Sequence, residues 1–377
     1  MLSFKNILRE IFLDLLSLFG NLFFLFSKKP KIEPEKIKKI LIVKLYALGD
    51  CVYTSPMVAN LRANFPHAKI YWLVKKYSRS VVEHIEGIDG IIEWQTPKES
   101  LKKLQAEKFD IAFSTYRSPL AQLVLWFAHI PIRVGFAWKG RGFSLTHKIK
   151  FRGDILESDR YLKLIEDLGL PIKTRERRLI VSKEEKEDIE EKAKTFGIDL
   201  KHRPLVAIVP GGGDNPQLVM PMKRWATDRF AAVADYLIEN KKAQVVLIGS
   251  SSEVELAEKV QSYSKNKLIN ITGKTKLEDF VALLSIFDLF IAVDTGPVHM
   301  SAALGVPTIG LYGPSNPDIL EVATDINIII RKETQNPEYV PEKVFLRNFA
   351  GKSSDPVHPS MMKIQAEDVI QEIEKLI

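Results

Sequence analysis

Residues 289–311 read LFIAVDTGPVHMSAALGVPTIGL, and this stretch decides the fold class. Residues 289–293 form an apolar run, which is typical of a buried strand in a parallel sheet. Residues 298–304 have helical spacing, and residues 308–311 form a second apolar run. A strand, a helix and a strand in this order make the unit from which parallel α/β sheets are built.

The same alternation of apolar runs and helical patterns extends through the rest of the chain. Further strands are expected at residues 40–43, 69–74, 90–94, 110–113, 133–135, 205–209, 244–248 and 268–270. Helices are expected at residues 52–64, 97–107, 119–128, 230–239, 253–263 and 277–287. The pattern therefore predicts two α/β domains with a cleft between their strand carboxyl ends, the edge at which open α/β sheets bind ligands.

A chain of 377 residues is long enough for two domains of ordinary size. The predicted elements divide it into five segments. We expect an apolar N-terminal segment at 1–35, an N-terminal domain at 36–175, a charged linker at 176–200, a C-terminal domain at 201–360 and an amphipathic helix at 361–377.

The N-terminal segment contains the apolar stretch IFLDLLSLFGNLFFLF at residues 11–26. As a helix it would span about 24 Å, short of the ~30 Å hydrocarbon core of a bilayer. Lys28, Lys29 and Lys31 follow it, which favours an amphipathic helix lying in an anionic membrane interface. The alternative is a helix that packs on the protein or pairs two subunits.

The composition is that of an ordinary globular protein, with a net charge of +7. A mild basic excess suits a nucleotide diphosphate, a phosphorylated glycolipid or an acidic membrane face. Basic runs interleaved with aromatic residues are absent, so we do not expect nucleic-acid binding. The single cysteine, Cys51, excludes an intramolecular disulfide and a cysteine-built zinc site, which indicates a reducing compartment.

The first candidate motif is KLYALGD at residues 44–50, which joins a strand to a helix. Gly49 allows a close backbone approach at this turn. Asp50 either caps the helix, by accepting backbone N–H bonds, or is a carboxylate that takes a proton from a hydroxyl group. Lys44 is either a phosphate partner or a solvated residue at the end of the strand.

The second candidate motif is a glycine turn followed by a basic pair. Gly211 and Gly212 follow a strand and would let backbone N–H groups point at an anion. Lys223 and Arg224 come next and would neutralise a diphosphate leaving group. The alternative is an ordinary turn with a solvated basic pair.

The third candidate motif begins where the strand at residues 289–293 ends. Asp294 or Thr295 would cap the next helix, Pro297 fits its first turn, and free N–H groups at a helix start bind phosphate. His299 lies one turn into this helix. It is either close to a ligand or a buried histidine whose hydrogen bonds are satisfied within the protein. Glu253, after another strand, is either a favourable charge at a helix start or an acceptor for a ribose.

Two stretches resemble glycosyltransferase family 9, the ADP-heptose:lipopolysaccharide heptosyltransferases. They are KKILIVKLYALGD at 38–50 with TSPMVANLRANFP at 54–66, and FDLFIAVDTGPVHMSAALGVPTIGLYGPSNP at 287–317. The resemblance runs from about residue 38 to the end. It implies a GT-B fold of two Rossmann-like domains, with the acceptor bound by the first and the donor by the second. It also implies inverting transfer of a heptose from an ADP-sugar to a lipopolysaccharide core, without a metal or other cofactor.

The resemblance also implies roles for single residues. Asp50 would be the general base, Lys223 would contact the donor phosphate, and Glu253 would contact the ribose. The donor sugar and diphosphate would be held by Asp294, Thr295, Gly296 and His299. With a glycolipid acceptor, the apolar N-terminus predicts a cytoplasmic protein that is peripheral on the inner membrane.

Three features depart from the family pattern. The N-terminus is longer by about 35 residues, residues 345–362 contain no cysteine, and the glycine loop at 209–222 is extended. Two other functions stay open, namely a GT-B sugar-nucleotide epimerase and a non-catalytic nucleotide-sugar-binding module. A Rossmann dehydrogenase is disfavoured because no G-x-G-x-x-G follows the first strand.

Overall fold

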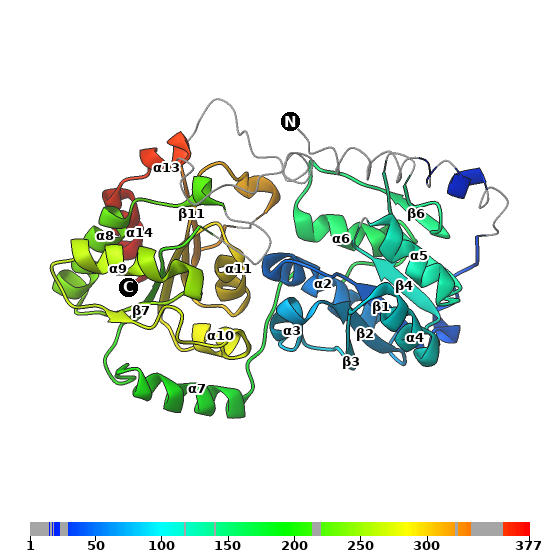
Figure 1. The fold of residues 1–377 in the computed structure, drawn as a ribbon, viewed down its shortest axis with the longest axis horizontal. Coiled ribbons are helices and arrows are strands. Elements are labelled where there is room, and N and C mark those ends of the chain that lie inside the picture. Colours follow the sequence, from blue (N-terminus) through cyan, green and yellow to red (C-terminus); the bar gives the residue numbers. More distant parts are fainter. Residues whose placement is uncertain are drawn as a thin grey trace. The chain divides into compact units, whose positions relative to one another are not determined.

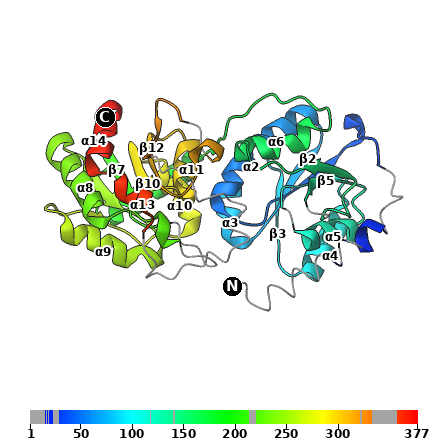
Figure 2. The same ribbon diagram turned by 90° about the horizontal axis from the view of Figure 1, so that it is seen from above.

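The computed structural model divides into two compact units, Met1–Arg178 and Leu179–Ile377. Each unit is built around a parallel sheet (Figures 1 and 2). The structure describes Leu15, Ser17 and residues 19–22, 29–116, 118–138, 141–212, 220–320, 323–332 and 357–377.

The first unit holds a six-stranded sheet in the order β3-β2-β1-β4-β5-β6, and each neighbouring pair is parallel. Its strands are β1 (Lys39–Val43), β2 (Lys69–Val74), β3 (Gly90–Glu93), β4 (Ile111–Ser114), β5 (Ile132–Ala137) and β6 (His147–Lys150). Its helices are η1 (Pro34–Lys36), α2 (Leu48–Asn64), α3 (Lys76–Val82), α4 (Pro97–Glu107), α5 (Pro119–Phe127) and α6 (Glu157–Glu166). Helix α2 packs against α3 and α6, and α4 packs against α5.

The second unit holds another six-stranded parallel sheet, in the order β12-β11-β10-β7-β8-β9. Its strands are β7 (Leu205–Val209), β8 (Gln244–Leu247), β9 (Ile269–Asn270), β10 (Leu289–Val293), β11 (Thr308–Tyr312) and β12 (Asn327–Arg331). Its helices are α7 (Lys183–Thr195), η2 (Pro221–Lys223), α8 (Thr227–Lys241), η3 (Ser251–Glu253), α9 (Val254–Tyr263), α10 (Leu277–Leu284), α11 (Gly296–Ala303), η4 (Pro317–Ile319), α13 (Pro359–Lys363) and α14 (Ala366–Leu376). Both sheets reverse their strand order beside the first strand, between β1 and β4 and between β7 and β10.

Aspartates at the amino edge of each sheet tie neighbouring strands together. The Oδ2 atom of Asp110 accepts hydrogen bonds from the backbone N–H groups of Lys38 and Lys39, at 2.7 and 2.8 Å. The Oδ2 atom of Asp288 accepts one from Leu205, at 2.7 Å. These aspartates are structural because their carboxylates satisfy strand ends that would otherwise lack a partner.

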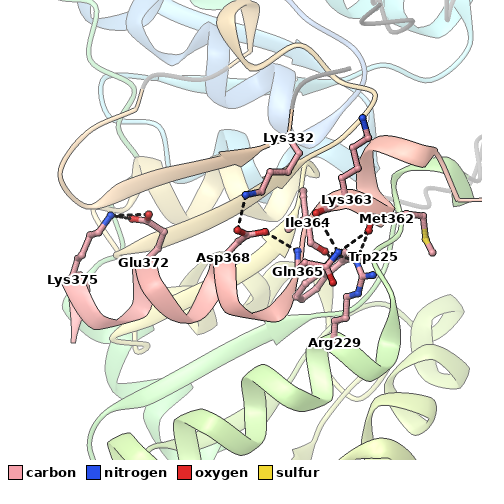
Figure 3. A network of polar contacts seen from close by, with 10 residues as sticks. All are labelled: Trp225, Arg229, Lys332, Met362, Lys363, Ile364, Gln365, Asp368, Glu372 and Lys375. Carbon is pink, nitrogen blue, oxygen red and sulfur yellow. Dashed lines mark hydrogen bonds and ion pairs between the residues drawn. The ribbon is translucent and has the colours of Figure 1, made fainter. Parts of the chain in front are cut away.

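The C-terminal helix α14 packs against α8 and β12 and belongs to the core of the second unit (Figure 3). Val369 and Ile373 are fully buried in that core. The segment before the helix is held by Trp225, whose Nε1–H donates to the Ile364 carbonyl at 2.9 Å. Lys332 binds the Asp368 carboxylate at 2.6 Å.

Most predicted strands and helices are confirmed to within a few residues. The elements β6, α3, α6 and β12 were not predicted. The segment predicted as a linker, residues 176–200, contains α7, and α7 packs against α10. The predicted N-terminal apolar helix lies mostly outside the described residues; Leu15, Ser17 and residues 19–22 are helical. None of the helices in the described ranges is both long enough and apolar enough to cross a bilayer.

Candidate active site

In the first unit, the chain leaves β1 and turns into α2 beside the point where the strand order reverses. Ala47 occupies the cap position of α2 with φ 68°, and Asp50 lies in the first turn. The interpretation of Asp50 as the helix cap is therefore wrong. Its Oδ2 atom instead lies 2.6 Å from Lys44 Nζ, and 31% of the Asp50 side chain is exposed. The carboxylate is thus accessible at the carboxyl edge of the sheet, where ligands bind in such folds.

Lys44 is buried, with 6% of its side chain exposed, so the alternative of a solvated strand end is wrong. Its Nζ donates to the Tyr161 hydroxyl at 2.7 Å and lies 4.8 Å from the centre of that ring. The Trp72 indole N–H donates to the Lys44 carbonyl at 3.2 Å and holds its backbone. Gly49 is buried within α2. The role of Lys44 as a phosphate partner stays a prediction. In the structure, the Lys44 ammonium group is paired with the Asp50 carboxylate.

In the second unit, Asp294 follows β10 and is the centre of a buried polar cluster. Its Oδ2 atom lies 2.6 Å from Lys223 Nζ and also accepts a hydrogen bond from the Ser315 hydroxyl. Its Oδ1 atom lies 3.1 Å from His299 Nε2. All four side chains are buried, so the alternative of a solvated Lys223 is wrong.

The charges of this cluster support one another. Burial alone would raise the pKa of the Asp294 carboxyl, but the neighbouring Lys223 and the hydrogen bond with His299 hold that pKa well below its usual range. A buried ion pair of this kind needs both partners, because either charge alone would be uncompensated. The alternative that His299 is a satisfied, buried histidine fits this contact with Asp294.

The start of α11 supplies a further polar group at the same edge. Thr295 is the cap residue, Gly296 is the first helical residue, and Pro297 lies in the first turn. The Thr295 hydroxyl is buried and has no hydrogen-bond partner within the part of the chain that is described. An unsatisfied buried hydroxyl costs roughly 1–3 kcal/mol, which indicates a position prepared for a ligand.

The glycine turn after β7 makes room for two side chains. A Cβ atom on Gly211 would lie 1.4 Å from Glu253 Oε1, and one on Gly212 would lie 2.7 Å from Arg224 Cγ. The Oε2 atom of Glu253 accepts from the Ser250 N–H and hydroxyl groups, each at 2.7 Å. Glu253 is therefore fixed in a capping box at the start of η3. Residues 213–219 of this predicted loop lie outside the described residues.

Two residues of these sites were not predicted from the sequence. Ser315 lies in the turn after β11, and its strand, which ends at the same edge as β10, was the available signal. Tyr161 lies on α6, which was not predicted; the available signal was the helical spacing of Tyr161, Leu164 and Ile165, which are all buried.

Comparison with known proteins places this chain in a family. A family model described as glycosyltransferase family 9 (heptosyltransferase) matches residues 99–347. Lipopolysaccharide heptosyltransferase 2 of Salmonella typhimurium is 26% identical and aligns with 90% of this chain and 98% of its own. The lipopolysaccharide core heptosyltransferase OpsX of Haemophilus influenzae is 25% identical and aligns with 91% of this chain and 98% of its own.

Solved structures agree with this result. The family 9 glycosyltransferase of Veillonella parvula has a TM-score of 0.77 and 24% identity, over 92% of this chain and 99% of its own. The Escherichia coli ADP-heptose lipopolysaccharide heptosyltransferase II has a TM-score of 0.72 and 25% identity, over 90% and 98%. This chain therefore belongs to glycosyltransferase family 9, the heptosyltransferase family, and is a glycosyltransferase.

Proposed function

We propose that this protein transfers a heptose from ADP-heptose to a lipopolysaccharide core acceptor, with inversion at the anomeric carbon and without a metal cofactor. The names of its relatives support the sugar and the acceptor, because those proteins align over nearly their whole length. The observation that carries the reaction is the Asp50 carboxylate, which is accessible at the sheet edge and paired with a buried lysine.

The acceptor hydroxyl loses its proton to Asp50 as its oxygen attacks the anomeric carbon. One carboxylate suffices, because inversion needs a single displacement from the face opposite the leaving ADP. A base placed within hydrogen-bond reach of that hydroxyl contributes typically 10²–10⁴-fold to the rate.

The donor is held by the second unit. The start of α11 and Arg224 meet the negative charge that develops on the diphosphate, and Lys223 contributes from its place beside Asp294. Gly211 and Gly212 let the backbone come close, Glu253 faces the ribose, and the heptose lies near His299. Thr295, Gly296 and Pro297 form the start of α11. The Thr295 hydroxyl, which has no hydrogen-bond partner among the described residues, supports this assignment.

The N-terminal segment brings the protein to the cytoplasmic face of the inner membrane, where a glycolipid acceptor would lie. Its described part supports this proposal. Leu15, Phe19 and Leu22 have 51%, 66% and 62% of their surfaces exposed, whereas Ser17 is buried. Large apolar side chains on one face of a helix suit an interface between water and lipid.

Titration calorimetry with ADP, GDP, UDP and CDP, in buffer containing EDTA, tests the donor. We expect selective binding of ADP. Transfer assays with ADP-heptose and core acceptors then compare the native protein with Asp50→Asn, which should bind ADP normally and lose transfer. A preference for another nucleotide would replace the donor, and ADP binding without any transfer would point to a binding module.

A further inference from the structure

We infer that Tyr161 and Glu157 of α6 are positioning residues that hold Lys44 against Asp50 and so orient the base. This inference rests on the proposed role of Asp50. It is carried by an unbroken chain of polar contacts that runs from the partly exposed Asp50 carboxylate into the interior of the first unit.

The chain starts at Lys44 Nζ, which lies 2.6 Å from Asp50 Oδ2 and 2.7 Å from the Tyr161 hydroxyl. That hydroxyl donates to Glu157 Oε1 at 2.6 Å. The other oxygen of Glu157 is ion-paired with Arg160, whose guanidinium group lies 4.6 Å from the Phe151 ring. Tyr161, Glu157 and Arg160 are all buried.

The direction of these hydrogen bonds is determined by the number of protons. A tyrosine hydroxyl has one proton, and here it goes to Glu157, so the oxygen lone pairs face Lys44 and can only accept. Burial, with Asp50 and Glu157 nearby, raises the pKa of Tyr161 well above its usual value, so the hydroxyl stays protonated. Tyr161 therefore orients Lys44 and does not exchange protons with it.

The charges of the chain also balance. Lys44 and Arg160 are cations, and Asp50 and Glu157 are anions, so each charge in this cluster has an opposite partner. If the Lys44 ammonium group moved away from Asp50, this buried charge would no longer have an opposite charge beside it. Because Lys44 occupies Oδ2 of Asp50, Oδ1 is the oxygen that would accept the proton of the substrate.

The test uses Tyr161→Phe, which keeps the ring beside Lys44 and removes only the hydroxyl. We expect kcat to fall about 10-fold with the KM values for donor and acceptor unchanged, since a buried lysine loses one acceptor. Tyr71→Phe is the matched control, because it removes a tyrosine hydroxyl from β2 in the same unit. It should leave kcat unchanged.

A second variant, Glu157→Gln, removes the next contact of the chain; because it also leaves the buried Arg160 without its opposite charge, thermal unfolding is measured beside kcat so that a folding loss is recognised. A glutamine side chain has one acceptor oxygen, whereas Tyr161 and Arg160 each need an acceptor. We therefore expect kcat to fall again, with the KM values for donor and acceptor unchanged. In an Asp50→Asn background neither substitution should lower the residual rate further, because both act through Asp50.

The outcomes separate the two proposals. If Asp50→Asn keeps only a small residual rate while Tyr161→Phe and Glu157→Gln both keep the native kcat, the positioning role is wrong and the base stands. Further losses in the Asp50→Asn background would also overturn it, in favour of a general structural role. If Asp50→Asn keeps the native rate, the proposed base itself is wrong.

Discussion

Lys223 and Asp294 are 71 residues apart in the sequence, and the lysine ammonium group lies 2.6 Å from the aspartate carboxylate. Their contact joins the segment after β7 to the segment after β10. These two strands are neighbours at the point where the strand order of the sheet reverses. The pair thereby connects two of the loops that carry the proposed donor residues.

Replacing Asp294 by asparagine should destabilise the second unit strongly. Breaking a buried ion pair by removing one partner costs about 3–5 kcal/mol, because Lys223 would be left buried and uncompensated. Urea denaturation at pH 7 measures this loss. Asp288→Asn, which keeps an acceptor oxygen at the opposite edge of the sheet, is the comparison and should cost less.

The same variant should change how stability depends on pH. The pKa of Asp294 is lowered in the folded protein, so its stabilising effect is present above the unfolded pKa of about 3.9 and is lost as the pH falls. The difference in unfolding free energy between native protein and Asp294→Asn should therefore shrink below about pH 4. A difference that stays constant down to pH 2.5 would contradict the charged pair.

Gly211→Ala should displace Glu253, because the new Cβ atom would overlap its carboxylate. The displaced side chain would lose its two hydrogen bonds with Ser250, at a cost of about 1–2 kcal/mol. Thermal unfolding and ADP calorimetry measure the effect. The double variant Gly211→Ala with Glu253→Ala should be no worse than Glu253→Ala alone, since the overlap is then gone; an additive loss would show another cause.

Cys51 should be inert to thiol reagents in the folded protein. It is fully buried in α2, and burial raises the pKa of its thiol to about 12, so the reactive thiolate is scarce at neutral pH. Labelling followed by mass spectrometry should show no modification until guanidinium unfolds the chain. Because this is the only cysteine, rapid labelling under native conditions would mean that α2, and Asp50 with it, opens locally.

Ile373→Ala should destabilise the second unit by about 2–4 kcal/mol, because the side chain is fully buried between α14 and the sheet core. Ile370→Ala, on the same helix and only partly buried, should cost clearly less. Chemical denaturation of both variants gives the comparison. Equal losses would show that α14 contributes through its helical structure and not through the packing of one face.

The α/β class, the two-sheet organisation and the loops that carry the sites followed from local patterns. A short apolar run such as residues 289–293, followed by a helical pattern and a second apolar run, favours a buried parallel strand, and residues after parallel strands collect at one edge. Asp50, Asp294 and His299 could therefore be assigned to sheet edges from their position in the chain alone. Four elements escaped. Strands β6 and β12 and helix α3 are short, so each gives little local pattern, whereas α6 has an amphipathic pattern that was not recognised among its charged residues.

The sequence by itself determined which residues would lie at the carboxyl edges of two parallel sheets, because strand and helix periodicity depends on near neighbours. Only the tertiary structure decided that Lys44 and Lys223 are buried, that Asp50 pairs with a lysine and does not cap its helix, and that Tyr161 lies 117 residues further along the chain yet contacts Lys44. A charged side chain is buried only where opposite charges and hydrogen-bond partners meet it. Those partners come from distant segments, which no local pattern contains.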